Sequence, residues 1–377
     1  MKLTLFIDTL QTGGTQRQIV ALARGLASRG NDVQLLTVFP GGRFWEEANS
    51  CGAFRTLSLY RRRSGSKASR VLSFFSVPAR LRRWLRNNST DVLYSMLDVA
   101  NLSACLALLG VRQRPLLVWG IRASACQSGL RARIVQRLSG WFSHGVPLTI
   151  ANSARGLQAH EEMGFRFSRS AVVHNGFDTS AFQFDQDSRD KTRSAWGAAE
   201  DDIVVGLVGR VDPMKGHDHF IAAAESLLPS EHRFRFVCVV PDPAEARGRL
   251  ERLTDLHRIG DRLLIVDGGR KMNATYSAID VLVSASNAEG FPNVVGEAMA
   301  CGRACVVTDV GDAAILVGDC GLLVPAGDAA ALAAAIAEAV IDRHKRGTCG
   351  KSRIASEFSI ETMVEKSRKT IEDALAS

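Results

Sequence analysis

The sequence predicts an α/β protein with two parallel-sheet domains that face each other across an interdomain cleft. Three observations support this fold class. The 377 residues exceed what one hydrophobic core usually organises. Each half alternates short β-branched runs with helical patterns, which is typical of parallel sheets covered by crossover helices. A polar, turn-rich stretch over 175–197 separates the halves and is the predicted linker.

The expected strands recur along both halves, with helices between them. In the first half they cover 2–8, 32–39, 54–59, 92–95, 115–120, 148–151 and 171–174, and in the second 202–209, 234–240, 263–267, 281–284 and 304–308. We place an N-terminal domain at 1–183, a C-terminal domain at 184–357, and a helix at 358–377 as a candidate to pack back on the first domain. Ligands of open α/β sheets bind at the carboxyl ends of the strands, so we expect the site in those loops.

Hydropathy and cysteine usage suggest a soluble protein of a reducing cytoplasm. No run reaches the roughly 18 apolar residues that span a bilayer, and the first residues lack the long apolar region of a signal peptide. The eight cysteines contain no CxxC spacing, so we expect unpaired, buried thiols. Cys301 and Cys305 lie four apart without a histidine at ligand spacing, which disfavours a metal site.

Positive charge is concentrated in the first half. Residues 1–170 hold 24 Lys and Arg against 8 Asp and Glu, a net charge of +16, whereas the remainder has a net charge of −8. Aromatic residues interleave with a basic segment, whose members are Arg61, Arg62, Arg63, Lys67, Arg70, Phe74, Phe75, Arg80, Arg82, Arg83, Trp84 and Arg86. Such a segment can meet an anionic membrane, water or nucleic acid. We favour the membrane surface over a solvated face, and expect no nucleic-acid partner.

A pair of glycines follows the first expected strand. Gly13 and Gly14 precede a helical pattern whose apolar face includes Ile19 and Leu22. Glycines let the backbone approach a ligand, and a helix N-terminus favours phosphate. The same pair can also be an ordinary turn. The spacing is not GxGxxG, which disfavours dinucleotide binding.

Two cations follow the first strand of the second half. Arg210 leaves the strand end, and Lys215 comes five residues later, just before a helix. Fixed cations over a helix N-terminus suit a departing diphosphate, although both could simply face solvent. The run His217, Asp218, His219 is read as the polarity of a first helical turn rather than as a metal site.

Two carboxylates flank a Gly-Phe-Pro turn in the stretch SNAEGFPNVVGEAMACG, which runs from 286 to 302. Glu289 lies in a strand-to-helix loop and Glu297 in the opening turns of the helix. The segment from Gly290 to Val294 can direct backbone N–H groups at a ligand. A loop carboxylate can hold sugar hydroxyls or face developing positive charge, and a helix carboxylate can accept from both hydroxyls of a ribose.

Three stretches together resemble glycosyltransferase family 4, retaining enzymes of the GT-B fold, which has two facing Rossmann-like domains. They are VVHNGFD at 172–178, VGRVDPMKGHDHFIAAA at 208–224, and SNAEGFPNVVGEAMACGRACVVTDVGDAAILVGDCGLLVPAGD at 286–328. The last matches the family's E-x7-E signature at Glu289 and Glu297. The order of these residues after Arg210 and Lys215 is also the family's order. The resemblance covers essentially the whole chain.

The resemblance implies a nucleotide-sugar donor in the second domain, with catalytic roles for Glu289, Lys215 and Arg210. It places Arg210 and Lys215 on the diphosphate, Glu289 on the transferred sugar and Glu297 on the ribose. The donor would also contact Gly290, Phe291, Asn293 and Val294, and Gly14 from across the cleft. The family needs neither a cofactor nor an enzymatic nucleophile, and no metal is expected.

Some positions depart from the family's pattern. After the strand in LLVWGIRAS, where many relatives carry His, this chain places Arg122 on the acceptor side. The Gly-Gly loop continues with Thr15 and Gln16 instead of Ala-Glu, and Gly302 is followed by Arg303 and Ala304 instead of Val-Pro. The one DxD motif, starting at Asp185, lies in the predicted linker. These differences suggest a distinct acceptor subgroup.

The predicted function is therefore transfer of a sugar, from a UDP-sugar by preference, to a lipid-linked or polysaccharide acceptor in bacterial surface glycan assembly. We expect a cytoplasmic protein that associates peripherally with the inner face of the plasma membrane. Two alternatives stay open at this point. One is a non-hydrolysing nucleotide-sugar epimerase of similar fold, and the other is a non-catalytic protein that binds nucleotide-sugars or a membrane surface.

Overall fold

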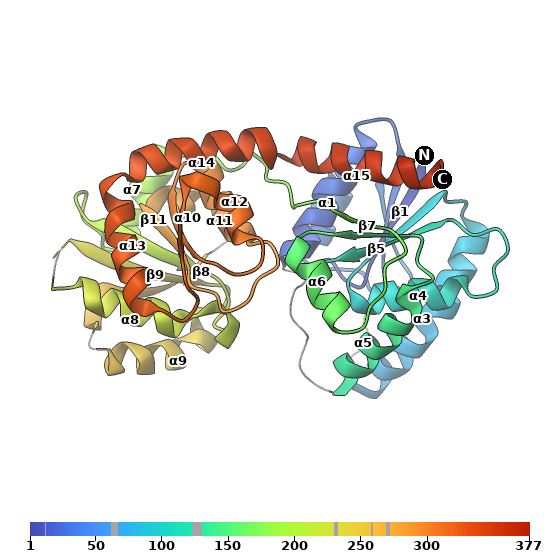
Figure 1. Cartoon of the computed structure of the whole chain (residues 1–377), viewed down its shortest axis with the longest axis horizontal. Coiled ribbons are helices and arrows are strands. Elements are labelled where there is room, and N and C mark those ends of the chain that lie inside the picture. The colour runs from blue at the N-terminus through green and yellow to red at the C-terminus, as the bar shows by residue number, and fades with distance from the viewer. Residues whose placement is uncertain (12, 62–66, 123–129, 230–232, 258, 269–271) are drawn as a thin grey trace. The chain divides into compact units, whose positions relative to one another are not determined.

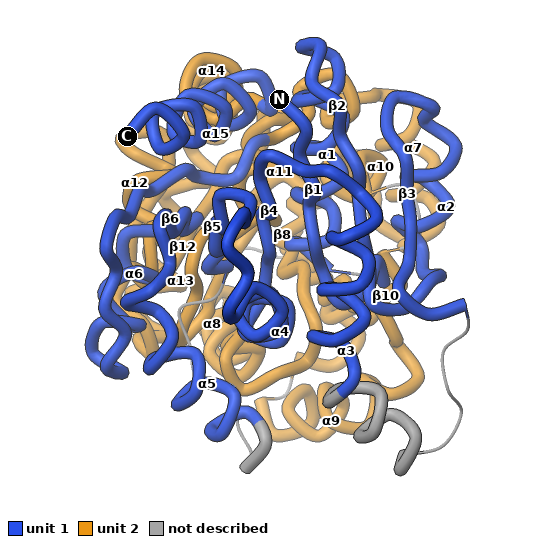
Figure 2. The backbone as a smooth tube through the Cα atoms, turned by 90° about the vertical axis from the view of Figure 1, so that its right-hand side faces the viewer, with its two compact units in different colours: residues 1–176, 360–377 blue, residues 177–359 orange. Residues whose placement is uncertain are grey.

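A computed structural model describes the chain except for residues 12, 62–66, 123–129, 230–232, 258 and 269–271 (Figure 1). The chain forms two compact units, coloured separately in Figure 2. Unit 1 contains residues 1–176 and 360–377, and unit 2 contains residues 177–359. The sequence-based boundaries at 183 and 357 lie a few residues from these divisions.

Unit 1 is a seven-stranded parallel sheet with helices on both faces. The strand order is β3-β2-β1-β4-β5-β6-β7. The strands are β1 (Lys2–Ile7), β2 (Asp32–Thr37), β3 (Arg55–Ser58), β4 (Val92–Met96), β5 (Leu116–Ile121), β6 (Leu148–Ala151) and β7 (Ser170–Val172). The helices are α1 (Gly14–Ala27), α2 (Arg43–Ser50), α3 (Lys67–Asn87), α4 (Asp98–Leu108), α5 (Leu130–Ser143), α6 (Ala154–Glu162) and α15 (Ile360–Leu375).

Helix α15 joins unit 1 although it comes last in the chain. It packs against α1. A Cβ on Gly25 of α1 would lie 2.4 Å from Cγ2 of Val364, so the small residue permits the close approach of the two helices. Val364 and Ile371 of α15 are buried in the core that α1 shares with the sheet.

Unit 2 is a six-stranded parallel sheet in the order β10-β9-β8-β11-β12-β13. The strands are β8 (Ile203–Val208), β9 (Phe234–Val240), β10 (Leu263–Asp267), β11 (Val281–Ser284), β12 (Ala304–Thr308) and β13 (Leu322–Val324). The α-helices are α7 (Gln186–Ala195), α8 (His217–Leu227), α9 (Pro243–Leu256), α10 (Met272–Ala278), α11 (Asn293–Ala300), α12 (Ala313–Val317), α13 (Ala329–Ile341) and α14 (Arg343–Glu357). Single 3₁₀ turns are η1 (Pro213–Lys215), η2 (Gly260–Arg262) and η3 (Gly318–Cys320).

The predicted fold class, two parallel-sheet α/β domains, is confirmed. Each expected strand has a counterpart whose ends differ by at most about two residues. Strand β13 was not predicted, because it has only three residues and its first two are not fully buried. Among the helices of the described chain, none is long and apolar enough to cross a membrane.

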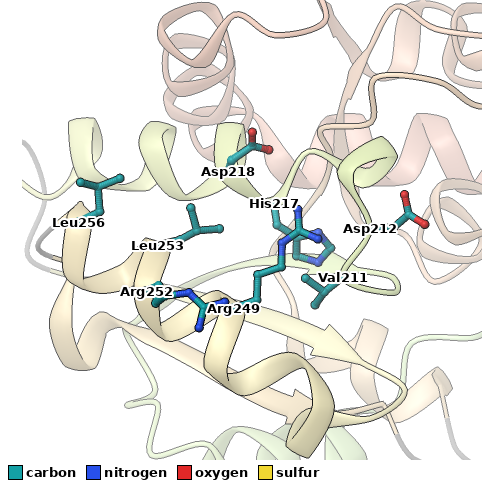
Figure 3. A pocket seen from close by; sticks show the side chains of 8 residues that line it. All are labelled: Val211, Asp212, His217, Asp218, Arg249, Arg252, Leu253 and Leu256. Carbon is teal, nitrogen blue, oxygen red and sulfur yellow. The ribbon is translucent and has the colours of Figure 1, made fainter.

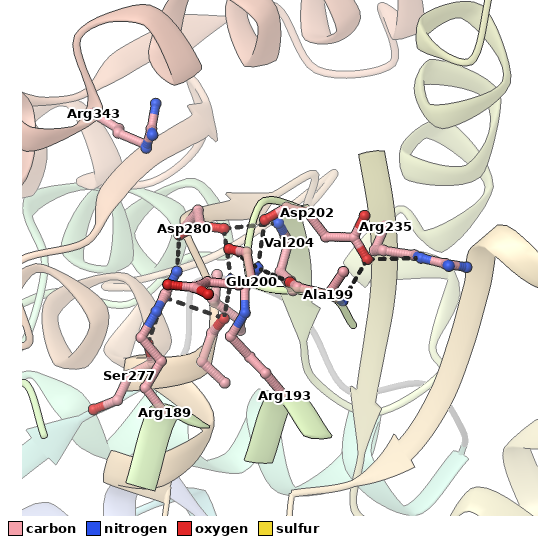
Figure 4. A network of polar contacts seen from close by, with 12 residues as sticks. Arg189, Arg193, Ala199, Glu200, Asp202, Val204, Arg235, Ser277, Asp280 and Arg343 are labelled. Carbon is pink, nitrogen blue, oxygen red and sulfur yellow. Dashed lines mark hydrogen bonds and ion pairs between the residues drawn. The ribbon is translucent and has the colours of Figure 1, made fainter. Parts of the chain in front are cut away.

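The division between the units falls inside the predicted linker, between Gly176 and Phe177, but the rest of the segment belongs to unit 2 and contains helix α7 (Figure 4). Arg189 and Arg193 of α7 donate to the two carboxylate oxygens of Asp280 at 2.7 and 3.0 Å. Burial alone would raise the pKa of Asp280, but Arg189, the Val204 N–H and Arg193 together hold it below its usual value. The DxD motif begins this helix, since Asp185 caps α7 by accepting from the Ser188 N–H. The polar residues are thus packing groups of the unit.

The prediction that the cysteines are unpaired is also wrong at one place. Cys320 of η3 and Cys349 of α14 form a disulfide, with Cα atoms 5.4 Å apart. Spacing could not reveal it, because the two residues are 29 positions apart and meet only through the packing of α14. Cys301 and Cys305 are free, buried thiols, as expected, and burial raises the pKa of Cys301 to about 12.

Candidate active site

The candidate site lies where the strand order of unit 2 changes direction. Strand β8 is flanked by β9 on one side and β11 on the other, so the crossovers leaving β8 and β11 depart toward opposite sides. Ligands of open α/β sheets bind outside the carboxyl ends of the strands at such a switch point. Lys215 follows β8 and Glu289 follows β11, which places both at this edge.

The loop after β8 is pressed against the end of β11. Gly216 has a φ of 63°, and a Cβ there would lie 1.9 Å from the carbonyl oxygen of Ala285, so only glycine fits. Asn287 also holds this loop. Its N–H donates to the Met214 carbonyl at 2.8 Å, and its Nδ2 donates to the Pro213 carbonyl at 2.9 Å. These contacts fix the backbone that carries Lys215.

Lys215 and Glu289 form an ion pair. Lys215 Nζ donates to Glu289 Oε1, which also accepts from Ser286 Oγ at 3.0 Å. The two side chains are 27% and 15% exposed, so the pair is screened less than a surface pair. The structure thus brings together two predicted site residues that are 74 positions apart.

The backbone of Glu289 and Gly290 is held by the loop after β12. Gly311 has a φ of 61°, and a Cβ there would lie 2.3 Å from the carbonyl oxygen of Glu289. The Asp312 N–H donates to the Gly290 carbonyl at 2.9 Å. Glycine at 311 is therefore required for the close approach of the two loops.

Helix α11 begins directly after this turn. Asn293 and Val294 are its first residues, and the first amides of a helix have no acceptor within it. These amides and the helix dipole favour negative charge at this end. The side chain of Phe291 is buried against Phe177 and Phe358, with ring centroids 6.2 and 5.6 Å away. The predicted contact of its backbone with a donor stays a prediction.

Glu297 lies one turn further into α11 and is 4% exposed. Its Oε2 accepts from the hydroxyl of Tyr276 at 2.8 Å, and Tyr276 is itself fully buried. The neighbouring Gly296 lets α11 pack on Phe177, because a Cβ there would lie 2.1 Å from the phenyl ring. Glu297 and Glu289 therefore have different partners, a neutral phenol and an ammonium group.

Arg210 is placed at the end of β8 with an exposed side chain. Among the described residues it has no ion-pair partner, in contrast to Lys215. It is free to move onto an anion that reaches this edge of the sheet. Its predicted role on a diphosphate stays a prediction.

Two predicted site residues belong to unit 1. Gly14 is the first residue of α1. Arg122 follows β5, and its guanidinium donates to the hydroxyl of Tyr94 at 2.9 Å and to Asn175 Oδ1 at 3.2 Å. Burial, opposed by Arg122, raises the pKa of Tyr94, so the phenol stays neutral. Arg122 is thus held in place without a carboxylate partner in this contact. The predicted contacts of Gly14 and Arg122 with substrates stay predictions.

Comparisons with known proteins give the family. A model described as Glycosyltransferase Family 4 matches residues 12–181, and one described as Glycosyl transferases group 1 matches residues 202–342. The chain belongs to glycosyltransferase family 4. The D-inositol 3-phosphate glycosyltransferase of Geodermatophilus obscurus is 35% identical over 57% of this chain and 49% of its own. The lipopolysaccharide core biosynthesis mannosyltransferase LpsB of Rhizobium meliloti is 30% identical over 51% and 57%.

The chain thus spans about half the length of the curated relatives it matches. Solved structures agree on the fold of this family 4 member. HepE of Anabaena in complex with UDP has a TM-score of 0.80 at 20% identity and covers 99% of this chain and 100% of its own. Sucrose-phosphate synthase of Thermosynechococcus elongatus has a TM-score of 0.83 at 19% identity and covers both chains fully. The predicted GT-B fold is confirmed.

A separate cavity of about 400 Å³ lies in unit 2 between the start of α8 and α9 (Figure 3). Its lining includes His217 and Arg249 but neither Lys215 nor Glu289. Burial, followed by the charge of Arg249, lowers the pKa of His217 to about 4, so the imidazole is neutral near pH 7. Neither ring nitrogen has a hydrogen-bond partner among the described residues. The run beginning at His217 forms the first turn of α8, as expected, but His217 itself is buried instead of facing solvent.

Sequence reasoning missed the residues that position the family's motif. Ser286 and Tyr276 hold the two glutamates, while Tyr94 and Asn175 hold Arg122. Tyr276 gave no signal, because it lies in another helix, 21 positions before its partner. Asn175 was inside a quoted motif, VVHNGFD, and its position after β7 could have assigned it to the same sheet edge as Arg122.

Proposed function

We propose that this glycosyltransferase is a retaining enzyme that moves a sugar from a UDP-sugar to a lipid-linked or polysaccharide acceptor of a bacterial surface glycan. The observation that carries the proposal is the Lys215–Glu289 ion pair at the switch point of the unit 2 sheet. HepE, which shares the fold, has been solved with UDP and with UDP-glucose, which supports the donor class. The mannosyltransferase of lipopolysaccharide core biosynthesis supports the acceptor class.

The donor diphosphate would be neutralised by protein groups. Lys215 and Arg210 supply two positive charges, and the first amides of α11 supply N–H donors at the same edge. When a diphosphate arrives, Lys215 can share its ammonium protons between Glu289 and the phosphate oxygens. These charges already stabilise a leaving diphosphate, and for this reason we propose a reaction that needs neither metal nor cofactor.

Glu289 would then act on the transferred sugar. Its second carboxylate oxygen can accept from sugar hydroxyls, and its negative charge can stabilise positive charge that develops at the anomeric carbon. Retention follows if the acceptor hydroxyl attacks from the face that the diphosphate leaves and the diphosphate takes the proton. The protein then contributes position and electrostatics rather than a covalent intermediate.

Glu297 would hold the ribose from its buried position. Because Tyr276 fixes one carboxylate oxygen, the group is oriented before the ligand binds.

Lipid-linked acceptors lie in the membrane, and we therefore also propose that the protein associates peripherally with its cytoplasmic face. The excess of Lys and Arg in the first half of the chain supports this association.

A donor screen followed by product analysis tests the function. The purified chain is incubated with single nucleotide-sugars, and the melting temperature is recorded for each. We expect UDP-sugars to raise it more than other nucleotide-sugars. The best donor is then mixed with a bacterial lipid extract, and the anomeric configuration of the product is determined by NMR.

Four outcomes would contradict the proposal. An inverted anomeric centre would exclude retention. An epimerised donor formed without acceptor would indicate the epimerase alternative. Stabilisation by a donor without transfer to any lipid or oligosaccharide fraction would indicate a binding protein. Donor loading should persist after dialysis against a chelator, whereas lost binding would show a metal requirement.

A further inference from the structure

Helix α5 exposes a line of large apolar side chains. Ile134, Leu138 and Trp141 are 51%, 40% and 79% exposed. Their spacing of four and then three residues places them on one face of the helix. Single exposed apolar residues are common on proteins, but three aligned on one helix are not explained by chance exposure.

The opposite face of α5 is already used by the fold of unit 1. Val135, Gln136, Ser139 and Ser143 are buried there. The apolar line is therefore a second face and adds nothing to the core. Two exposed arginines, Arg133 and Arg137, each directly precede a member of the line, and the helix sequence LRARIVQRLSGWFS contains no acidic residue.

This combination fits an anionic lipid surface. A helix that lies in the membrane interface carries Trp, Leu or Ile on one face and Arg or Lys beside them. Trp places an apolar ring and a polar N–H at the headgroup level. The net charge of +16 over residues 1–170 gives the attraction its long range.

The segment that the sequence analysis proposed for this role is partly used elsewhere. In α3, Arg82 donates to the carbonyl oxygens of Ala107, at 2.8 Å, and Leu109 at the end of α4. Trp84 packs against the apolar core of unit 1. The side chains of 62–75 lie outside the described residues. Thus two members of the predicted segment serve the fold, and the exposed apolar anchor is found on α5.

Helices α3 and α5 nevertheless belong to one side of unit 1. Both contact α4, and Figure 2 shows α4 between them. Arg83 and Arg86 of α3 are exposed. They can therefore add to the positive charge around the α5 line.

We propose that Ile134, Leu138 and Trp141 of α5 insert into the headgroup region of an anionic bilayer, with Arg133 and Arg137 on the lipid phosphates. This docking surface deepens the proposed function, because it rests on the proposed peripheral association. Helix α5 follows β5 and Arg122 in the chain. An acceptor held in the same bilayer would be presented to unit 1, where the acceptor-side Arg122 lies.

Co-sedimentation with vesicles tests the surface. The full chain is mixed with vesicles of phosphatidylglycerol and phosphatidylcholine, or of phosphatidylcholine alone, at low and high salt. Wild-type protein should pellet with the anionic vesicles at low salt and be released as salt screens the attraction. Replacing Arg133 and Arg137 by Gln should lower the bound-to-free ratio about tenfold or more, since each basic residue near such a surface contributes roughly 1 kcal/mol.

Matched variants isolate the effect of position. Lys366→Gln with Lys369→Gln removes the same charge from exposed positions of α15 in the same unit and should change binding far less. Trp141→Ser should weaken binding, whereas Ile341→Ser should not, although Ile341 of unit 2 is 85% exposed. Melting curves show whether each variant is folded, and the arginine pair remains informative if Trp141→Ser is unstable.

Other results would overturn the proposal. Equal pelleting of wild type and the Arg133/Arg137 variant would exclude α5, as would equal pelleting with neutral vesicles. Wild-type dimers that are lost in Trp141→Ser, without vesicle binding, would show that the line is an interface between copies of the chain. The melting-temperature response to UDP-sugars should be the same in all variants. If wild type gives no such response but binds vesicles, the donor proposal fails while this one stands.

Discussion

The two units use their positive charges differently. In unit 2, buried and half-buried cations meet carboxylates: Arg189 and Arg193 meet Asp280, and Lys215 meets Glu289. In unit 1, Arg122 donates to the phenol of Tyr94 and the amide oxygen of Asn175. Arg82 donates to two backbone carbonyls. The ion pairs described in unit 1 are partly exposed, such as that of Arg155 and Glu162.

This difference separates internal charge from charge that is available to a partner. In unit 2 the cations are compensated by acids of the same unit, so an arriving anion must compete for them. In unit 1, Arg82 and Arg122 have the neutral partners named above, so no acid in these contacts offsets their charge. Removing Asp280 should therefore damage unit 2 strongly, whereas removing Arg82 from unit 1 should leave no uncompensated charge.

The largest expected effect comes from Asp280→Asn in unit 2. This change leaves Arg189 and Arg193 without their carboxylate, and Arg193 is 4% exposed. Breaking a buried ion pair by removing one partner costs about 3–5 kcal/mol. We expect a fall of this size in the free energy of unfolding, measured with urea. Glu251→Gln removes an acid from the exposed pair with Arg247 and should cost less than about 1 kcal/mol. Equal losses for the two variants would contradict the comparison.

Lys215→Ala should have the next largest effect, on turnover. The change removes a cation from the switch-point edge and leaves Glu289 without its ion-pair partner. Loss of one charge-stabilising donor lowers the rate by about 10²–10³-fold. Initial rates of sugar transfer measure it. Arg252→Ala, a change of the same charge away from the ion pair, serves as the control. A folded Lys215→Ala protein with wild-type turnover would show that the pair is only structural.

These expectations show how far the sequence alone could go. Spacing and strand pattern were enough to place Lys215 and Glu289 after strands at one edge of the sheet, because parallel strands put their carboxyl ends at one edge. That the two strands are neighbours came from the structure. The ion pair itself could not be predicted, because it depends on the contacts that Gly216 and Asn287 make between two loops. Such contacts leave no periodic signal in a sequence.

Polar composition does not distinguish a linker from a helix whose charges are buried. The stretch containing Arg189 and Arg193 has the composition of a linker, and only Asp280, almost ninety residues later, makes it a packed helix. The prediction of unpaired cysteines was wrong for Cys320 and Cys349 for a similar reason, since their pairing depends on where α14 lies. Side-chain exposure could not be predicted either. Trp84 and Trp141 both lie in helical segments that contain several arginines, yet Trp84 packs on a core and Trp141 is 79% exposed.

The two glutamates of unit 2 allow a sharper comparison within one site. Glu297 is buried on Tyr276, whereas Glu289 is paired with Lys215. If Glu297 holds the ribose, Glu297→Gln should weaken binding of UDP by about 1.5–3 kcal/mol for a lost charged hydrogen bond. Glu289→Gln should spare UDP and impair turnover of the UDP-sugar instead. Calorimetry with UDP measures both, and the division of roles is wrong if Glu289 matters as much as Glu297.

The smallest effect is expected in unit 1, from Arg82→Gln. Arg82 donates to the carbonyl of Ala107 at 2.8 Å and to that of Leu109, so it caps the end of α4 without an acid. Its loss removes hydrogen bonds to neutral carbonyls and leaves no unpaired charge, so it should cost roughly 1–2 kcal/mol of unfolding free energy. Arg83→Gln, at the next and exposed position, should stay within about 0.5 kcal/mol of wild type. Urea unfolding of both variants and of Asp280→Asn ranks their losses of unfolding free energy. If Arg82→Gln lost as much unfolding free energy as Asp280→Asn, neutral partners would hold arginine as tightly as carboxylates do, and the contrast between the units would be wrong.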